Sequence, residues 1–144
     1  MTRGREVREV IVYCDGGSRG NPGPAAIGAV VVDPTVSPPR RLATVSERIG
    51  VTTNNVAEWR AVIAGIEAAA RFRPRSVRLR ADSQLVVRQL RGEYRVRQPH
   101  LQPLHERARA LLEQFDEVDV RHVPRDANAE ADALVNAALD GAAP

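Results

Sequence analysis

The sequence predicts a single α/β domain with a five-stranded mixed sheet, three antiparallel strands followed by parallel ones, flanked by helices. Two observations predict this fold. Three β-rich segments come first with no helix between them, which is typical of a meander. Helical and strand-like segments then alternate, which is typical of parallel crossover units. A length of 144 residues suits one domain, and no repeat or long linker divides the chain.

Three strands are expected in the first 50 residues. The first covers Val7–Cys14 and ends at the turn signal Gly16-Gly17. The second covers Ala25–Val32, and the proline-rich segment Asp33–Arg41 is expected to form the loop after it. The third, Leu42–Gly50, alternates imperfectly between polar and apolar residues.

The later elements follow from helical spacing, alternation and end signals. A helix is expected from near Asn55 to about Arg71, because apolar residues recur at helical spacing and Pro74 lies just past its end. Further elements are a strand over Ser76–Asp82, a short helix capped by Ser83 and ending near Gly92, a helix marked by Leu101, Leu104, Ala108, Leu111, Leu112 and Phe115, a strand over Val118–Val123, and a helix over Asn128–Leu139 closed by Gly141.

Composition excludes several function classes. All 21 basic residues are arginine, which excludes a P-loop lysine, a Schiff base and a lysine general base. One cysteine and three histidines cannot build a zinc finger or a disulfide framework, and we expect Cys14 to pack in a strand. Five aromatic residues are too few for a protein that stacks successive bases. We see no signal peptide or membrane span and expect a cytoplasmic protein.

Positive charge is concentrated in the middle of the chain. Residues 71–109 contain 11 arginines and 3 acidic residues, whereas residues 110–144 contain 2 arginines and 8 acidic residues. One interpretation is a surface that binds phosphates, because the guanidinium group forms bidentate contacts with them. The other is a solvated helix face, and the residues alone leave both open.

Two aspartates follow predicted strands. Asp15 stands at the end of the first strand and Asp82 at the end of the fourth, where each could also be a turn or capping residue. The helix between them allows the two strands to be parallel, so their ends point the same way. Functional sites in open α/β sheets form at such ends. If the strands are neighbours, we expect the two carboxylates to lie a few ångströms apart.

Two further carboxylates lie on predicted helices. Glu58 is placed in the first turn of its helix, where it could simply compensate the helix dipole. Asp132 lies about one turn into the last helix among apolar residues, which is unusual for a solvated acid. Four converging carboxylates would repel one another unless cations lay between them. Oxygen-only ligation indicates Mg²⁺ or Mn²⁺.

Four ordered motifs resemble those of the ribonuclease HI family, in its shorter subclass without a basic protrusion. They are Asp15-Gly16-Gly17-Ser18-Arg19-Gly20-Asn21-Pro22-Gly23, Thr53-Asn54-Asn55-Val56-Ala57-Glu58, Asp82-Ser83-Gln84 and Asn128-Ala129-Glu130-Ala131-Asp132-Ala133-Leu134. The resemblance spans about residues 7–139 and implies a ribonuclease H-like fold. It also implies that Asp15, Glu58, Asp82 and Asp132 are the catalytic, metal-binding carboxylates.

The implied activity is hydrolysis of the RNA strand of RNA/DNA hybrids, leaving 3′-hydroxyl and 5′-phosphate ends. Two Mg²⁺ ions per site, with Mn²⁺ as a possible substitute, would clamp an in-line displacement, and Asp15 would bridge them. Double-stranded RNA is a further candidate substrate, and we expect a monomer. The alternatives are a catalytically inactive module that binds hybrids or double strands, and a related integrase or junction resolvase. The latter would need insertions that this compact chain lacks.

The resemblance also implies substrate-binding residues. These are Gly16, Asn21, Thr53, Asn54, Asn55 and Gln84. Amide side chains both donate and accept, which suits 2′-hydroxyls and minor-groove edges. Thr53 could contact a DNA phosphate. Outside these motifs, turn and cap chemistry would be the simpler explanation for such residues.

The chain departs from the family in two places. The protrusion is reduced to residues 92–99, where Tyr94, Arg95 and Arg97 are candidates for part of its grip on the DNA strand, or form a plain solvated connection. Many members also carry a mobile histidine in the loop before the last helix. Here that loop is Pro124–Ala127, so Arg125 is a candidate phosphate contact, and His122 is interpreted as a packed strand residue. We expect Trp59 in the core and flexible tails at residues 1–6 and 141–144.

Overall fold

The computed structural model describes residues 7–141 and confirms the predicted order of elements. Of the tails expected at 1–6 and 141–144, residues 1–6 and 142–144 lie outside these residues. The elements are β1 (Glu9–Ser18), β2 (Gly23–Asp33), β3 (Arg40–Thr52), α1 (Asn54–Ala70), β4 (Ser76–Ala81), α2 (Gln84–Leu90), α3 (Gln102–Leu112), β5 (Glu117–His122), a 3₁₀ turn η1 (Arg125–Asn128) and α4 (Ala129–Leu139). The 3₁₀ turn replaces the plain loop that we expected at Pro124–Ala127.

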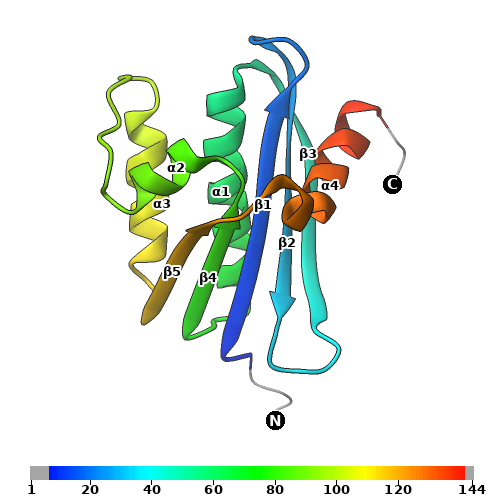
Figure 1. Ribbon diagram of the computed structural model, residues 1–144, viewed down its shortest axis with the longest axis vertical. Helices are drawn as coiled ribbons and strands as arrows, with labels where there is room; N and C mark the ends of the chain where they lie inside the picture. Colours follow the sequence, from blue (N-terminus) through cyan, green and yellow to red (C-terminus); the bar gives the residue numbers. More distant parts are fainter. Residues whose placement is uncertain (1–6, 142–144) are drawn as a thin grey trace.

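The sheet has the strand order β3-β2-β1-β4-β5, as Figure 1 shows. β1 pairs antiparallel with β2, which pairs antiparallel with β3, whereas β1–β4 and β4–β5 are parallel. This is the predicted mixed sheet. The three mutually parallel strands β1, β4 and β5 have their carboxyl ends at the same edge of the sheet, where functional sites form in such folds.

β1 is longer than the sequence predicted. It does not end at Gly16-Gly17 but continues to Ser18, because Gly16 and Gly17 pair with Ile27 and Ala26 of β2. A pair of glycines usually signals a turn, but here the antiparallel ladder holds both in an extended strand. The turn instead follows at residues 19–22, where Gly20 adopts a positive φ of 95°.

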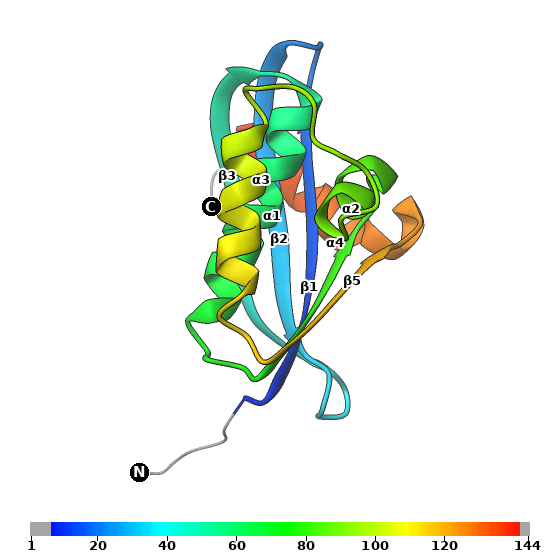
Figure 2. The same cartoon turned by 90° about the vertical axis from the view of Figure 1, so that its left-hand side faces the viewer.

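Helices cover the two faces of the sheet. α1 packs on one face with α3 outside it, and α4 packs on the opposite face over β1, β2 and β3 (Figures 1 and 2). Two neighbouring residues of β2 show the division. A Cβ at Gly28 would overlap with the Ala131 carbonyl oxygen of α4, whereas Ala29 contacts the Gly65 position of α1. Successive strand residues point to opposite faces, so small residues let both helices approach closely.

The main core lies between α1 and the sheet. Val10, Val12 and Cys14 alternate inward along β1, and Trp59 of α1 is fully buried, as predicted. Leu101 and Phe115, which flank α3, close the core at its outer layer. No helix within residues 7–141 is long and apolar enough to cross a membrane.

Candidate active site

Asp15 and Asp82 lie side by side at the carboxyl edge of the parallel strands. The last residue pair between β1 and β4 is Cys14 with Ala81. The two aspartates are therefore the next residues along adjacent strands. The register confirms that β1 and β4 are neighbours, which the sequence only allowed, although Asp15 lies inside β1 rather than at its end.

α1 brings Glu58 to these aspartates. Thr53 caps the helix, because its Oγ1 accepts a hydrogen bond from the Val56 amide at 3.3 Å. A Cβ at Gly16 would overlap with the Ala57 carbonyl oxygen, so the missing side chain lets α1 press against β1 beside Asp15. Glu58 is the fifth helical residue, and no acidic residue lies in the first turn. The helix-dipole interpretation of Glu58 is therefore wrong.

Asp132 reaches the site from the opposite face of the sheet. It lies in the first turn of α4 and accepts a hydrogen bond from Asn136 Nδ2 at 3.3 Å. The start of this helix is fixed to β1 by Asn128, which is 1% exposed and donates through Nδ2 to the Cys14 carbonyl at 2.9 Å. Because Cys14 precedes Asp15, this buried bond sets the position of Asp132 relative to Asp15. Sequence analysis included Asn128 in a motif but gave it no role.

The four carboxylates influence one another electrostatically. Burial raises the pKa of Asp15 to about 8, and the negative charge of Asp82, a hydrogen bond to Asp132 and the charges of Asp132 and Glu58 add to this. Burial, followed by the charge of Asp82, raises the pKa of Glu58 to about 7, against a lowering by a hydrogen bond to Ser83. The pKa of Asp15 is therefore influenced by all three other carboxylates.

The floor of the site is apolar and leaves little free space. Cys14, Val62, Ala81 and Val86 line a crevice of about 10 Å³ beneath Asp15, Glu58 and Asp82. Such a crevice has room for about one water molecule. A large ligand therefore has to lie across the carboxylates rather than enter a pocket. The same apolar floor explains why burial is the largest cause of the raised pKa values.

The donor set fits a hard divalent cation. Cys14 is not a ligand, because it is 1% exposed, donates its thiol to the Arg80 carbonyl at 3.6 Å, and burial raises its pKa. The remaining donors are carboxylate oxygens, which Mg²⁺ and Mn²⁺ prefer. In this conformation, however, no three acidic, histidine or cysteine side chains within residues 7–141 stand ready to hold one ion. The metal site thus stays a prediction, supported by the donor chemistry.

The polar motif residues divide into two groups. Asn21, Thr53 and Asn54 do the capping and turn work that the sequence left open: Asn21 Oδ1 accepts from the Asn54 amide at 3.1 Å, and Asn54 Oδ1 accepts from the Ser18 amide at 2.8 Å. The side-chain amides of Asn55 and the exposed Gln84 form no hydrogen bond with another residue in 7–141. Their amides are therefore available to a substrate.

The basic middle segment also divides into two groups. Six of its arginines contact carboxylates: Arg75 with Asp116, Arg78 with Glu9, Arg80 with Asp119, Arg88 and Arg91 with Glu93, and Arg107 with Glu67. Five of these six belong to a solvated, ion-paired surface, whereas the Arg80 side chain is only 13% exposed. The other five arginines of the segment are exposed and form no ion pair with any residue in 7–141; they are Arg71, Arg73, Arg95, Arg97 and Arg109. Of these, Arg95 and Arg97 stand in the connection after α2. Both line a cavity of about 440 Å³ together with Asn55, Gln89 and Tyr94.

The interpretation of His122 as a packed residue is wrong. It is the last residue of β5, as expected for a strand histidine, but its side chain is exposed. In the register it pairs with Ala81, which immediately precedes Asp82. The imidazole therefore stands at the same sheet edge as the carboxylates. Only the parallel β4–β5 pairing reveals this position, and a single sequence does not display it. Arg125 begins η1 and is also exposed.

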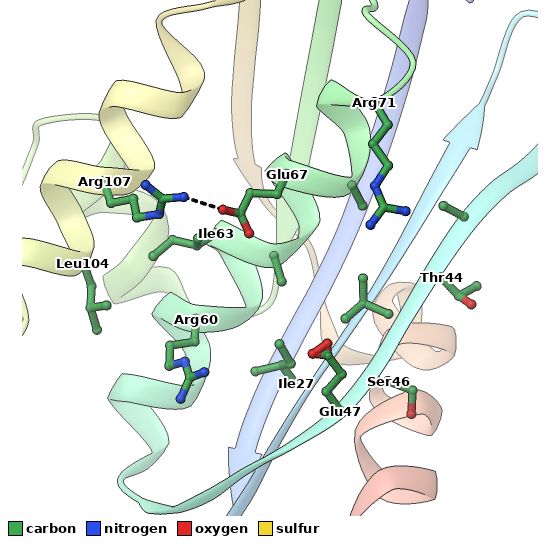
Figure 3. Close-up of a pocket in the computed structure, with 14 residues that line it drawn as sticks. Ile27, Thr44, Ser46, Glu47, Arg60, Ile63, Glu67, Arg71, Leu104 and Arg107 are labelled. Carbon is green, nitrogen blue, oxygen red and sulfur yellow. Dashed lines mark hydrogen bonds and ion pairs between the residues drawn. The ribbon is translucent and has the colours of Figure 1, made fainter. Parts of the chain in front are cut away.

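A separate cavity of about 590 Å³ lies away from the carboxylates. It is bounded by β2, β3, α1 and α3, and Figure 3 shows Arg60, Arg71 and the Arg107–Glu67 ion pair around it. None of the predicted site residues lines it. We assign it no part in the chemistry.

Known proteins share this fold and much of this sequence. The Reverse transcriptase-like family matches residues 13–138. The crystal structure of RNase H1 from the halophilic archaeon Halobacterium salinarum superposes with a TM-score of 0.87 at 48% identity, over 93% of this chain and 99% of that one. The chain belongs to the ribonuclease H family. Another family member, LC11-RNase H1 in complex with an RNA/DNA hybrid, is 40% identical with a TM-score of 0.85, over 92% of this chain and 98% of that one.

Curated members of the ribonuclease H family are longer than the matched region. Ribonuclease HI of Halobacterium salinarum is 49% identical over 92% of this chain, which spans 65% of that protein. The bifunctional protein Rv2228c of Mycobacterium tuberculosis is 44% identical over 94% of this chain, which spans 36% of it.

Proposed function

We propose that this ribonuclease H family member hydrolyses the RNA strand of RNA/DNA hybrids. The observation that carries the proposal is the convergence of four carboxylates at one open sheet edge, those of Asp15, Glu58, Asp82 and Asp132. The pKa of Asp15 is raised by burial and by the other three carboxylates, and by no other group within residues 7–141. The bound hybrid of LC11-RNase H1, which shares this fold at 40% identity, supports the choice of substrate. The products would carry 3′-hydroxyl and 5′-phosphate ends.

The four carboxylates would hold two Mg²⁺ ions, or Mn²⁺ in their place. When bound, such ions generate a nucleophile from water and stabilise the charge that develops on the leaving oxygen. The residues of this chain bring the ligands together: Gly16 admits α1 against β1, and Asn128 anchors α4 to the Cys14 carbonyl. Asp15, whose pKa is raised by all three other carboxylates, would be one of the ligands of these ions.

Substrate recognition would use the surface beside the carboxylates. The side-chain amides of Asn55 and Gln84 are available to donate to and accept from 2′-hydroxyls and minor-groove edges, which distinguish RNA from DNA. Asn21, Thr53 and Asn54 hold the adjoining backbone in place through their capping bonds. Gly16 is then needed mainly for the close approach of α1.

Arg95 and Arg97 would contact the phosphates of the DNA strand. Replacing both with alanine is expected to weaken hybrid binding about equally for all sequences, because phosphate contacts carry no sequence information. The slope of log K against log salt should fall in magnitude by about 1 to 2, since each phosphate contact contributes somewhat less than one unit. Fluorescence anisotropy across a salt series measures both. The control is Arg75→Ala, which removes an exposed arginine paired with Asp116, and an unchanged slope in the double variant would reject the contact.

Arg125 would contact the phosphate at the cleavage position. Arg125→Ala is expected to lower turnover by about tenfold, the loss of one charge-assisted hydrogen bond, while Mg²⁺ affinity stays the same. Steady-state cleavage and calorimetric Mg²⁺ titration separate the two effects. Arg121→Ala is the matched control, because Arg121 is an exposed neighbour whose guanidinium pairs with Asp119. Turnover equal to that of the parent chain would remove Arg125 from the site.

A gel assay tests the proposed function and its main alternative together. The substrate is a hybrid with an end-labelled RNA strand, incubated with Mg²⁺ beside EDTA, single-stranded RNA, double-stranded RNA and duplex DNA. Internal cuts in the hybrid that disappear with EDTA are expected. Retention of the hybrid without any cut would instead support an inactive binding module. Cutting of double-stranded RNA would widen the substrate class.

A further inference from the structure

The connection between α2 and α3 carries Arg95 and Arg97 but contains no helix or strand, and Figure 1 shows it as a loop beside both helices. Its backbone carbonyls therefore lack the partners that regular structure would give. Two glutamine side chains take their place. Gln89 Nε2 donates to the Arg95 carbonyl at 3.3 Å, and Gln102 Nε2 donates to the Val96 carbonyl at 3.1 Å. Consecutive carbonyls of the connection are thus held from α2 and from α3.

Gln89 is itself held firmly. Its side chain is 6% exposed, and its backbone carbonyl accepts a hydrogen bond from His105 Nε2 at 3.2 Å. A carbonyl oxygen only accepts, so this ring nitrogen carries the proton. The His105 ring also meets Trp59 edge-on, with centroids 5.5 Å apart. Trp59 follows Glu58, so a continuous series of contacts links the helix of the catalytic carboxylate to the arginine-bearing connection.

The held carbonyls fix where the two arginines point. Val96 between them is 6% exposed and packs into the core, whereas Arg95 and Arg97 are exposed. Both arginines consequently lie on the cavity that Asn55 and Gln89 also line. Rotation of this short connection would move both guanidinium groups at once.

We propose that Gln89 is a positioning residue that presents Arg95 and Arg97 to the nucleic-acid backbone, an inference that rests on the proposed function. Among residues 7–141, no donor lies within hydrogen-bonding distance of Gln89 Oε1, although this atom is buried. An unsatisfied buried acceptor is unfavourable for stability. The hydrogen bond that the Gln89 side chain does form is the donation from Nε2 to the Arg95 carbonyl. The amide is therefore present for its bond to the connection.

Gln89→Met tests the proposal, because methionine keeps the volume and removes both polar atoms. The matched control is Gln114→Met, which removes an exposed glutamine whose amide donates locally to the Leu111 carbonyl. In Mg²⁺ we expect the KM for the hybrid to rise about fivefold, because that ratio corresponds to the free energy of one neutral hydrogen bond. The kcat should stay within about twofold of that of the parent chain. The salt slope should also fall in magnitude. An unchanged KM and salt slope would overturn the proposal.

A double-mutant cycle separates positioning from general destabilisation. Adding Gln89→Met to the Arg95→Ala/Arg97→Ala variant should cost little further affinity, because the groups that it positions are already gone. Additive losses would overturn the proposal. Hydrogen exchange is a test that does not depend on cleavage. The backbone amide hydrogens of residues 92–98 should exchange with solvent faster in Gln89→Met than in Gln114→Met. Equal exchange would overturn the proposal even if the chain cuts no hybrid.

Discussion

Asp82→Asn is expected to lower the rate of hybrid cleavage by at least about a thousandfold while leaving hybrid binding within about twofold. The substitution keeps the size of the side chain and removes one negative ligand from the site. Asp82 is the largest charge influence on both Asp15 and Glu58, so its removal also relieves repulsion in the folded chain. Single-turnover cleavage and anisotropy on the same preparation measure the two quantities.

The matched control for this variant is Asp126→Asn. Asp126 is an exposed carboxylate in η1, near the start of α4 but outside the converging set. Its substitution changes the net charge by the same amount and should leave the cleavage rate within about twofold. A rate for Asp82→Asn within tenfold of the parent chain would remove Asp82 from the catalytic site and with it the interpretation of the sheet edge.

Asp15→Asn is expected to stabilise the metal-free protein at alkaline pH. The pKa of Asp15 rises from its usual 3.8 to about 8 in the folded chain, and that of Glu58 rises from 4.5 to about 7. At a pH between the unfolded and the folded pKa of each residue, the folded chain keeps a proton on that carboxyl, whereas the unfolded chain has released it. Their contribution to stability is complete below about pH 4 and is lost as the pH rises through about 8. In EDTA the parent chain should therefore lose stability between pH 5.5 and 8.5.

Thermal melts in EDTA at these two pH values measure the effect. At pH 8.5 we expect Asp15→Asn to be more stable than the parent chain by about 2 kcal/mol, or about 6 °C, well below the full linkage value because the carboxyl is partly open to solvent. The difference should shrink at pH 5.5, where Asp15 is protonated. Added Mg²⁺ should stabilise the parent chain more than the variant. Equal melting temperatures at both pH values would contradict the electrostatic description of the site.

The sequence predicted the mixed sheet well because local patterns carry that information. Alternation marked β4, and Ser83 caps α2 as expected, with its Oγ accepting from the Val86 amide. Acidic residues next to predicted strand ends indicated Asp15 and Asp82 as candidates, although β1 continues past Asp15 to Ser18. Such local patterns can be recognised without knowing which distant residues are in contact. The one assumption about distant contacts was that β1 and β4 are neighbours, and the register confirms it.

What the sequence could not predict depends on pairing across the fold. Gly16 and Gly17 look like a turn, and only the partner residues of β2 show that they extend a strand. His122 looks like a packed strand residue, and only its pairing with Ala81 brings it to the site. Likewise, Arg95 and Arg88 are equally basic in the sequence. The structure separates them, because Arg88 contacts Glu93 and lies over the Tyr94 ring, whereas Arg95 lines the cavity beside Asn55.

We propose that the four carboxylates cut the RNA strand of a hybrid and do so only with a divalent cation. The most direct test is the single-turnover cleavage rate of an end-labelled RNA/DNA hybrid, measured against Mg²⁺ concentration for the parent chain and for Asp82→Asn. We expect no cleavage in EDTA, a rate that rises with Mg²⁺ and saturates, and no rise for the variant. Cleavage that persists in EDTA, or a variant that follows the parent curve, would contradict it.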